Sequence, residues 1–157
     1  MRVFLAAALA ATSLATAASA QAEDEMVVTR SGEQEGTIGS DKTFTGTAYV
    51  EPVFSNRDPF VTSGGKVTFL PGARSNWHSH PAGQVLIVTE GTGWVQQRDG
   101  ERIEMHAGDV IWTPPGVEHW HGATATGAVT HYAIQQYQDG KNVNWLEPVS
   151  DADYSGE

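Results

Sequence analysis

From residue 44 onward, short apolar runs alternate with clusters of turn-forming residues, and no stretch keeps a helical period. The runs are rich in Val, Ile, Thr and aromatic residues, and several alternate apolar with polar positions, which is typical of β-strands that bury one face. The breaks between them consist mainly of Gly, Pro, Asp and Ser. This pattern predicts nine strands, at residues 45–54, 66–70, 75–80, 84–90, 93–98, 101–105, 109–113, 119–123 and 128–137.

The breaks between the predicted strands are short enough for tight turns. Asp99-Gly100 predicts a hairpin with a type I′ turn, because both central residues of that turn need a positive φ. Short strands with tight turns and one apolar face predict an all-β fold, either a sandwich or a small closed barrel. With 157 residues, the chain has room for one domain with a hydrophobic core.

The first twenty residues differ in composition from this body. They begin with a basic residue, Arg2, continue with an apolar run and end in Ala18-Ser19-Ala20, a pattern that predicts a secretory signal peptide cut after Ala20. The alternative is a membrane anchor, which is disfavoured because the run is short and rich in alanine. The mature chain is therefore expected in the periplasm or outside the cell, without membrane association.

The mature chain divides into three predicted parts. Residues 21–43 are polar and contain several glycines, and we predict a mobile arm there, with one short strand at residues 26–29. Residues 44–149 form the predicted domain, and residues 150–157 form a C-terminal tail. For this tail we expect a frayed end in preference to a short helix capped by Ser150.

Charge and cysteine content restrict the partners and the stabilising elements. Acidic residues outnumber basic ones by 19 to 9, which gives a net charge of −10 and disfavours nucleic acid and anionic membrane surfaces as partners. The chain has no cysteine. An exported chain of this composition would have no disulfide bonds and would depend on packing and on any bound metal for its stability.

The histidines are concentrated between residues 72 and 131. His78 and His80 stand two apart, and residues i and i+2 of a strand share a face, so both rings point to the same side of the predicted sheet. A third imidazole from a distant segment would complete a set of three ligands on one side of a metal ion. Three neutral nitrogens and one carboxamide oxygen suit a divalent first-row metal. The alternative, a polar strand with exposed rings, leaves the second histidine-rich segment around His119 and His121 unexplained.

Two segments resemble the two sequence motifs of the cupin family. Residues 72–91 match the first as G-x5-H-x-H-x3-Q-x6-G, and residues 108–119 match the second as G-x5-P-x-G-x2-H. The resemblance implies a single-domain cupin jelly-roll β-barrel with a metal held inside. Gln84 stands where the family usually has glutamate, and a neutral ligand leaves the full charge on the metal, which favours anionic substrate groups. The alternative is that Gln84 only lines the barrel and three histidines bind the metal.

A narrower resemblance, to the bacterial cupin hydroxynitrile lyases, rests on residues 77–84, 119–123 and 130–135 and extends over residues 44–47 and 139–145. That family consists of small manganese-dependent proteins that form or split (R)-cyanohydrins. The resemblance implies a divalent metal ion, first of all manganese, while the donor set also admits iron, zinc, nickel, cobalt and copper. By position, it implies the catalytic base His131 and the metal ligands His78, His80, Gln84 and His119.

The implied reaction removes a proton from the hydroxyl of an aldehyde- or cyanohydrin-like small molecule as cyanide leaves. A metal lowers the pKa of a hydroxyl that it binds, and an imidazole with a pKa of about 6.5 accepts the proton. By strand parity His131 shares a face with Gln135, and we expect Gln135 to contact the substrate together with Val67 and Phe69. The alternative for His131 is a structural histidine bonded to a backbone carbonyl.

The remaining candidates are expected to have structural roles. His121 would lie behind the metal ligands or face solvent, and His106 would lie on the surface. Arg74 is expected to be a surface ion-pair partner in preference to a substrate ligand. Packing in the barrel core or at an interface is expected for Trp94, Trp112 and Trp120.

Two further functions stay open at this point. One is an iron- or copper-dependent cupin dioxygenase, and the other is a non-enzymatic cupin that binds a small molecule. The family resemblance also implies a homodimer or homotetramer, assembled through sheet edges and apolar barrel faces.

Overall fold

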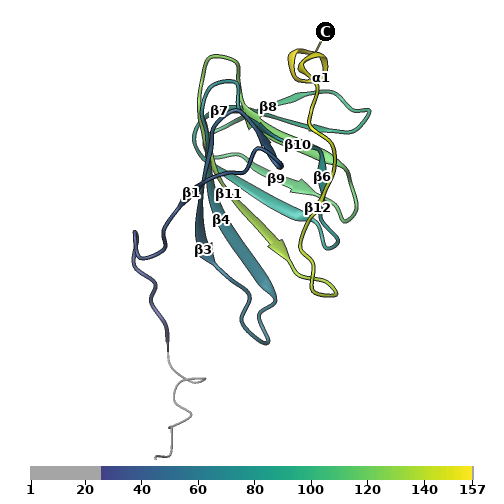
Figure 1. The fold of residues 1–157 in the computed structure, drawn as a ribbon. Helices are drawn as coiled ribbons and strands as arrows, with labels where there is room; N and C mark the ends of the chain where they lie inside the picture. The colour runs from purple at the N-terminus through teal and green to yellow at the C-terminus, as the bar shows by residue number, and fades with distance from the viewer. Residues whose placement is uncertain (1–25, 157) are drawn as a thin grey trace, which may run out of the picture. The chain divides into compact units, whose positions relative to one another are not determined.

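Short antiparallel strands account for nearly all of the secondary structure in residues 26–156, the part of the chain that the computed structural model describes. From residue 31 onward the chain forms one unit, and the predicted all-β class with a single domain is confirmed. The elements are β1 (Thr37–Ile38), β2 (Phe44–Thr45), β3 (Ala48–Phe54), β4 (Thr62–Phe69), β5 (Arg74–Ser75), β6 (His78–Ser79), β7 (Gln84–Gln97), β8 (Ile103–His106), β9 (Val110–Thr113), β10 (His119–Ala123), β11 (Val129–Gln136), β12 (Asn144–Trp145) and α1 (Asp151–Ser155) (Figure 1).

The strands form a curled sheet whose two halves share strand β7. The first half of β7 pairs with β11 and β9, and its second half pairs with β10 and β8. The order β1-β3-β4-β11-β7 therefore continues through β10 and β5 to β2. Strand β6 pairs with β10, and β12 pairs with β6. Because His121 in β10 contacts His131 in β11, the two halves face one another across a common interior.

The register of β4, β11 and β7 arranges inward-facing residues in layers. Strand β11 pairs with β4 on one side and with β7 on the other, and every second residue of a strand points to the same face. Successive layers toward the hydrophobic core are Ser63–Gln135–Gln84, Gly65–Ala133–Leu86 and Val67–His131–Val88. The polar residues of the first layer thus lie two layers away from His131.

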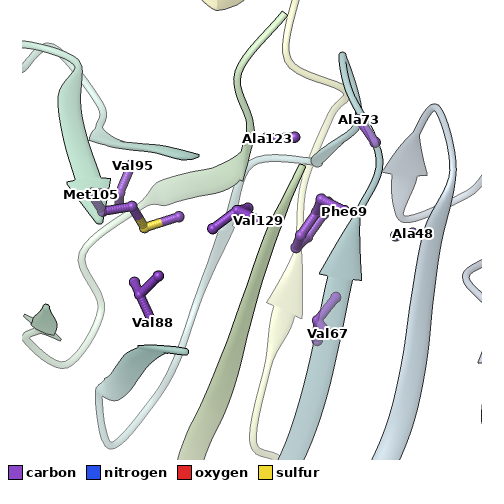
Figure 2. Packing of buried hydrophobic residues seen from close by; sticks show 9 residues of the cluster. All are labelled: Ala48, Val67, Phe69, Ala73, Val88, Val95, Met105, Ala123 and Val129. Carbon is purple, nitrogen blue, oxygen red and sulfur yellow. The ribbon is translucent and has the colours of Figure 1, made fainter. Parts of the chain in front are cut away.

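The hydrophobic core occupies one end of this interior. Phe69 and Ala48 have no exposed surface, and they pack with residues from several strands of both halves of the sheet (Figure 2). The buried cluster consists of Ala48, Val67, Phe69, Ala73, Val88, Val95, Met105, Ala123 and Val129. Because apolar side chains fill this end, the polar side chains gather in the layer of Gln84, which lies away from the core.

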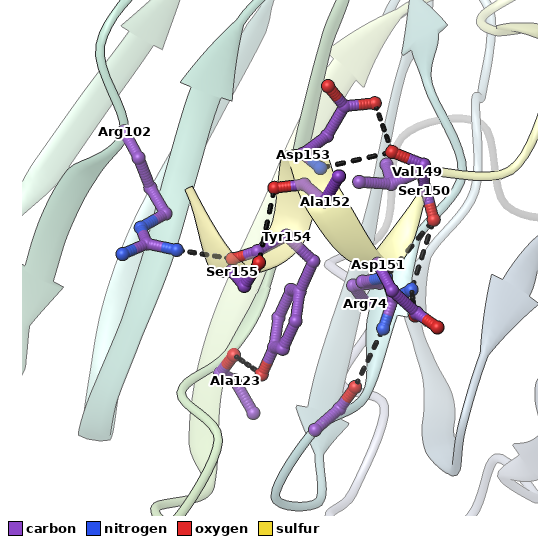
Figure 3. A network of polar contacts seen from close by, with 11 residues as sticks. Arg74, Arg102, Ala123, Val149, Ser150, Asp151, Ala152, Asp153, Tyr154 and Ser155 are labelled. Carbon is purple, nitrogen blue, oxygen red and sulfur yellow. Dashed lines mark hydrogen bonds and ion pairs between the residues drawn. The ribbon is translucent and has the colours of Figure 1, made fainter. Parts of the chain in front are cut away.

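The C-terminal residues are anchored to the sheet (Figure 3). Ser150 caps α1 with its side chain, and Tyr154, 9% exposed, donates its hydroxyl hydrogen to Ala123 O at 3.0 Å. Arg74, expected on the surface, is only 5% exposed and pairs with Asp151 at 2.6 Å. The prediction of a frayed end is wrong, because the helix cap and the buried Tyr154 ring hold the segment in place.

Several predicted strand boundaries also differ from the observed ones. Residues 84–90 and 93–98 belong to one strand, because β7 continues through Gly91, whose φ is 75°. Residues 75–80 contribute to two short strands, β5 and β6.

The prediction of a type I′ turn at Asp99-Gly100 is wrong. Asp99 has a φ of 61°, but Gly100 does not adopt a positive φ, and its N–H donates to Gln97 O at 3.0 Å. The turn is therefore centred one residue earlier.

The range predicted as an N-terminal arm contains strand β1, which pairs with β3. The predicted strand at residues 26–29 is absent, since residues 26–30 have no regular secondary structure. The predicted signal peptide and residues 21–25 lie outside the described residues. Within residues 26–156, no helix combines the length and the apolar character that a bilayer crossing needs.

Candidate metal centre

Three histidine side chains from two segments converge in the interior. His78 lies in β6, His80 directly follows that strand, and His119 begins β10, where it pairs with His78. One ring nitrogen of each histidine lies within 4.8 Å of the other two, and all three rings are buried. The structure therefore brings together the three histidines that the sequence analysis proposed as ligands.

Each of these rings is oriented by a backbone carbonyl group. The Nδ1 atom of each ring faces a carbonyl oxygen: that of Asn76 for His78 at 2.9 Å, that of Asn142 for His80 at 2.5 Å, and that of Val117 for His119 at 3.0 Å. Because a carbonyl oxygen only accepts, Nδ1 carries the hydrogen and Nε2 presents a lone pair. This is the usual support of histidines that bind a metal.

Gln84 adds an oxygen to these nitrogens. Its Oε1 lies 3.1 Å from His119 Nε2, and its Nε2 donates to Gln135 Oε1 at 3.4 Å. Since His119 donates through Nδ1, Gln84 Oε1 and His119 Nε2 are two acceptors that face one another with no hydrogen between them. His80 Nε2 is also buried, with no hydrogen-bond partner among the described residues. A cation at this point would satisfy all these acceptors, so the donor set fits a divalent metal ion.

Burial keeps the three histidines neutral. Loss of hydration lowers the pKa of His119 to about 4. It also lowers the pKa of His78 well below its ordinary value, and the nearby His119 adds to the effect. Burial lowers the pKa of His80 as well, although the hydrogen bond to Asn142 opposes this. Neutral rings keep their Nε2 lone pairs free for a metal at physiological pH.

A cavity of about 160 Å³ opens beside these side chains. Val67 and Gln135 line it, as the sequence analysis predicts. Phe69 does not: it is fully buried, and its ring packs against the rings of His121 and His131 at centroid distances of 5.6 and 5.7 Å. The prediction that Phe69 contacts a substrate is corrected accordingly, because its layer belongs to the hydrophobic core. The remaining wall is largely apolar, with Phe44, Val50, Ala133, Val143 and Trp145.

His131 lies behind His121 as seen from this cavity. His131 Nε2 is 3.0 Å from His121 Nδ1, and His121 lines the cavity whereas His131 is fully buried. Burial lowers the pKa of His131 to about 4 and that of His121 well below its ordinary value. The sequence analysis left His121 either behind the ligands or facing solvent. His121 stands two residues after His119 and so shares its face of the strand, and this spacing was the signal that His121 faces the interior.

A segment near the C-terminus closes one side of the cavity. Asn142, Val143 and Trp145 line it, and the Trp145 ring lies 4.9 Å from that of His78. Strand β12 holds this segment by pairing with β6. The sequence analysis placed no strand or site residue here, because a two-residue strand has no periodicity. Only the resemblance to the hydroxynitrile lyases extended over these positions.

The other aromatic and histidine residues have structural positions. The rings of Trp94 and Trp120 pack against Tyr154 at 5.1 and 5.8 Å, as predicted for core tryptophans. Trp112 is 56% exposed, so its predicted place in the core is wrong, and the alternative role at an interface stays a prediction. His106 is an exposed surface residue, as predicted, and none of these side chains lines the cavity beside the three histidines.

Comparison with known proteins identifies several relatives. The sequence model of the Cupin domain family matches residues 65–134. An (R)-mandelonitrile lyase from Granulicella tundricola is 50% identical over 129 residues, which cover 82% of this chain and 98% of that protein. The crystal structure of a cupin-like protein from Thermotoga maritima matches with a TM-score of 0.75 and 37% identity, over 82% of this chain and 96% of that one. A gentisate 1,2-dioxygenase from a Ralstonia species is 40% identical over 58 residues, or 37% of this chain and 16% of that protein.

Proposed function

Because this chain belongs to the cupin family, we propose that it is a metal-dependent carbon–carbon lyase that cleaves or forms cyanohydrins. The observation that carries the proposal is the arrangement of two histidine groups around one cavity. His78, His80 and Gln84 line one part of the wall and converge there with His119, which is not itself on the wall, and His121, backed by His131, lines another part. The relative named (R)-mandelonitrile lyase, which this chain matches over 98% of that protein's length, supports the same reaction.

A divalent cation, for which we propose manganese, would supply Lewis acidity when held by His78, His80, Gln84 and His119, and would lower the pKa of a substrate hydroxyl placed beside it. The neutral side chains of this set leave the whole positive charge of the ion available. The Nδ1–H groups of the three histidines keep their Nε2 atoms directed inward. Gln135 does the same for the oxygen of Gln84.

We propose His131 as the final acceptor of the hydroxyl proton, which reaches it through His121. Both rings are neutral at physiological pH, because burial lowers their pKa values. The ring of His121 accepts the hydroxyl proton from the cavity side and passes a proton to His131 along the 3.0 Å contact between Nδ1 and Nε2. The O–H electron pair forms the carbonyl bond as the carbon–carbon bond breaks, and its electron pair leaves with cyanide. Return of the proton to cyanide gives hydrogen cyanide and restores the neutral pair.

The cavity wall would hold the rest of the substrate. Phe44, Val143 and Trp145 would provide apolar contact, and the small residues Gly65 and Ala133 in the same wall leave space for a substituent. Exclusion of water by such a wall strengthens the electrostatic effects of the site. A small molecule with one hydroxyl or carbonyl group and an apolar substituent fits this arrangement.

Mandelonitrile cleavage by protein of controlled metal content tests the proposal. The chain is purified, treated with a chelator, and divided into metal-free and Mn²⁺-loaded samples, and the release of benzaldehyde is followed by absorbance. Cleavage is expected only in the loaded sample. Equal rates in the two samples, or no cleavage by a sample with one Mn²⁺ per chain, would overturn the proposed reaction.

A dioxygenase is a second candidate, supported by the 58-residue match to a gentisate 1,2-dioxygenase. A neutral donor set of this kind would also accept iron. Oxygen uptake by Fe²⁺-loaded protein in the presence of gentisate separates the two functions. Oxygen consumption linked to loss of gentisate supports the dioxygenase, whereas mandelonitrile cleavage without oxygen consumption supports the lyase.

A further inference from the structure

Ser63 lies where two polar side chains of the site meet. This residue of β4 is 8% exposed, and its Oγ accepts hydrogen bonds from Gln135 Nε2 at 3.1 Å and from Asn142 Nδ2 at 3.2 Å. The same hydroxyl donates to Gln135 O at 3.5 Å. A serine hydroxyl has one hydrogen and two lone pairs. The three contacts therefore use its whole hydrogen-bonding capacity.

Ser63 gives its hydroxyl hydrogen to Gln135 O and presents lone pairs to the Gln135 side chain, and this favours one orientation of Gln84. Because Gln135 directs its NH₂ group to Ser63, its Oε1 is turned toward Gln84 and accepts from Gln84 Nε2 at 3.4 Å. Gln84 must then direct its own Oε1 toward His119 Nε2, 3.1 Å away. A Gln84 amide turned the other way would present NH₂, which has no lone pair available for a cation. The three residues occupy one register layer of β4, β11 and β7.

The contact with Asn142 stabilises the segment that orients His80. The Asn142 side chain donates to Ser63, and its backbone oxygen faces His80 Nδ1 at 2.5 Å. Holding the side chain of Asn142 in place also holds this carbonyl, and the carbonyl keeps His80 Nε2 directed to the interior. That Nε2 atom is buried and has no hydrogen-bond partner among the described residues.

We propose that Ser63 is a positioning residue that sets two metal ligands at once, Gln84 through Gln135 and His80 through Asn142. The inference rests on the metal site of the proposed function, but it does not depend on the reaction that occurs there. Ser63→Ala leaves the half-buried NH₂ groups of Gln135 and Asn142 without their acceptor and frees the Gln135 amide to turn. Groups that support metal ligands contribute about 10- to 100-fold to metal affinity, and we expect a loss in that range.

The test measures Mn²⁺ binding to the metal-free full-length chain by isothermal titration calorimetry, together with the visible absorption of the Co²⁺-loaded protein. Ser63→Ala is expected to raise the Kd for Mn²⁺ at least about 10-fold and to change the Co²⁺ bands, which report the ligand set. Ser63→Thr keeps a hydroxyl and should restore both. The matched control is Thr68→Ala, which removes another β4 hydroxyl that bonds to β11, through Thr130 Oγ1 at 3.0 Å, and it should leave both readouts unchanged.

An unchanged Mn²⁺ Kd and unchanged Co²⁺ bands in Ser63→Ala would overturn the proposal, as would a loss of equal size in Thr68→Ala. If Ser63→Ala does not fold, Asn142→Ala decides, since it keeps the backbone carbonyl and removes the NH₂ donor to Ser63 without adding a charge beside the cation. That variant should bind Mn²⁺ more weakly, and wild-type affinity would overturn the proposal. Because the readout is metal binding, a weakened Ser63→Ala site supports the inference even if the protein cleaves no cyanohydrin. Conversely, an unchanged site overturns it even if cleavage is found.

Discussion

His121 Nδ1 and His131 Nε2 lie 3.0 Å apart, and their contact joins β10 to β11 across the interior of the fold. Only one hydrogen fits between the two nitrogens, so one ring donates it and the other accepts it. The His121 ring lies 5.2 Å from that of His78. The pair is thus close enough to the proposed metal ligands to act on a group that a bound metal would contact.

Loss of either ring of this pair should slow cyanohydrin cleavage. His131→Ala is expected to lower kcat for mandelonitrile at least about 100-fold, since general base catalysis contributes roughly 10²- to 10⁴-fold. The metal content should stay near that of the wild type, because His131 lies outside the converging set. His106→Ala, on the surface, is the control and should retain full activity. Full activity in His131→Ala with loss in His121→Ala would assign the base role to His121 alone.

Gln84→Glu should separate metal affinity from reactivity. A carboxylate brings a negative charge to the ion, so Mn²⁺ should bind more tightly, but the charge acting on a substrate hydroxyl is reduced. The variant also loses the N–H that donates to Gln135 Oε1. We expect a lower Kd for Mn²⁺ by calorimetry and a lower kcat. A kcat above that of the wild type would contradict the proposed role of a neutral ligand.

The absence of a side chain at Gly65 should determine how bulky a substrate the cavity accepts. Gly65 lines the cavity, and a Cβ built there would contact only Glu51 O, at 3.7 Å. Gly65→Ala should therefore fold normally, whereas Gly65→Val should narrow the cavity. For Gly65→Val we expect a rise of about 10-fold in KM for mandelonitrile and a smaller rise for acetone cyanohydrin. Equal effects on both substrates would show that this wall does not contact the substituent.

Acid should destabilise the metal-free protein through its buried histidines. Burial lowers the pKa of His119 and of His131 from 6.5 to about 4, so the unfolded chain takes up protons at a higher pH than the folded chain does. The contribution of these two rings to the free energy of unfolding is therefore fully present above pH 6.5. It is lost as the pH falls from 6.5 to 4, by about 3 kcal/mol for each ring. Thermal unfolding of metal-free protein between pH 7.5 and 4.5 should show a falling Tm. A constant Tm would contradict the neutral, buried state of these rings.

The all-β class and much of the site can be predicted from the sequence, because both depend on local spacing. Alternating apolar positions indicate strands whatever their partners are, and the two-residue spacing of His78 and His80 directs both rings to one face. The resemblance to the two cupin motifs adds Gln84 and His119 to the set. Parity also indicates that Val67, Gln135 and His131 face inward.

Only the tertiary structure decides how deep each inward-facing residue lies and which residue it meets there. Phe69 and Val67 share a face of β4 and both belong to the hydrophobic core, yet only Val67 also lines the cavity, because Phe69 lies one layer further from it. The contacts of His131 with His121 and of Ser63 with Asn142 join segments far apart in the chain. Periodicity determines the face of a strand but not its register against other strands. Such contacts arise only when the curled sheet brings its two halves, and the C-terminal segment, together.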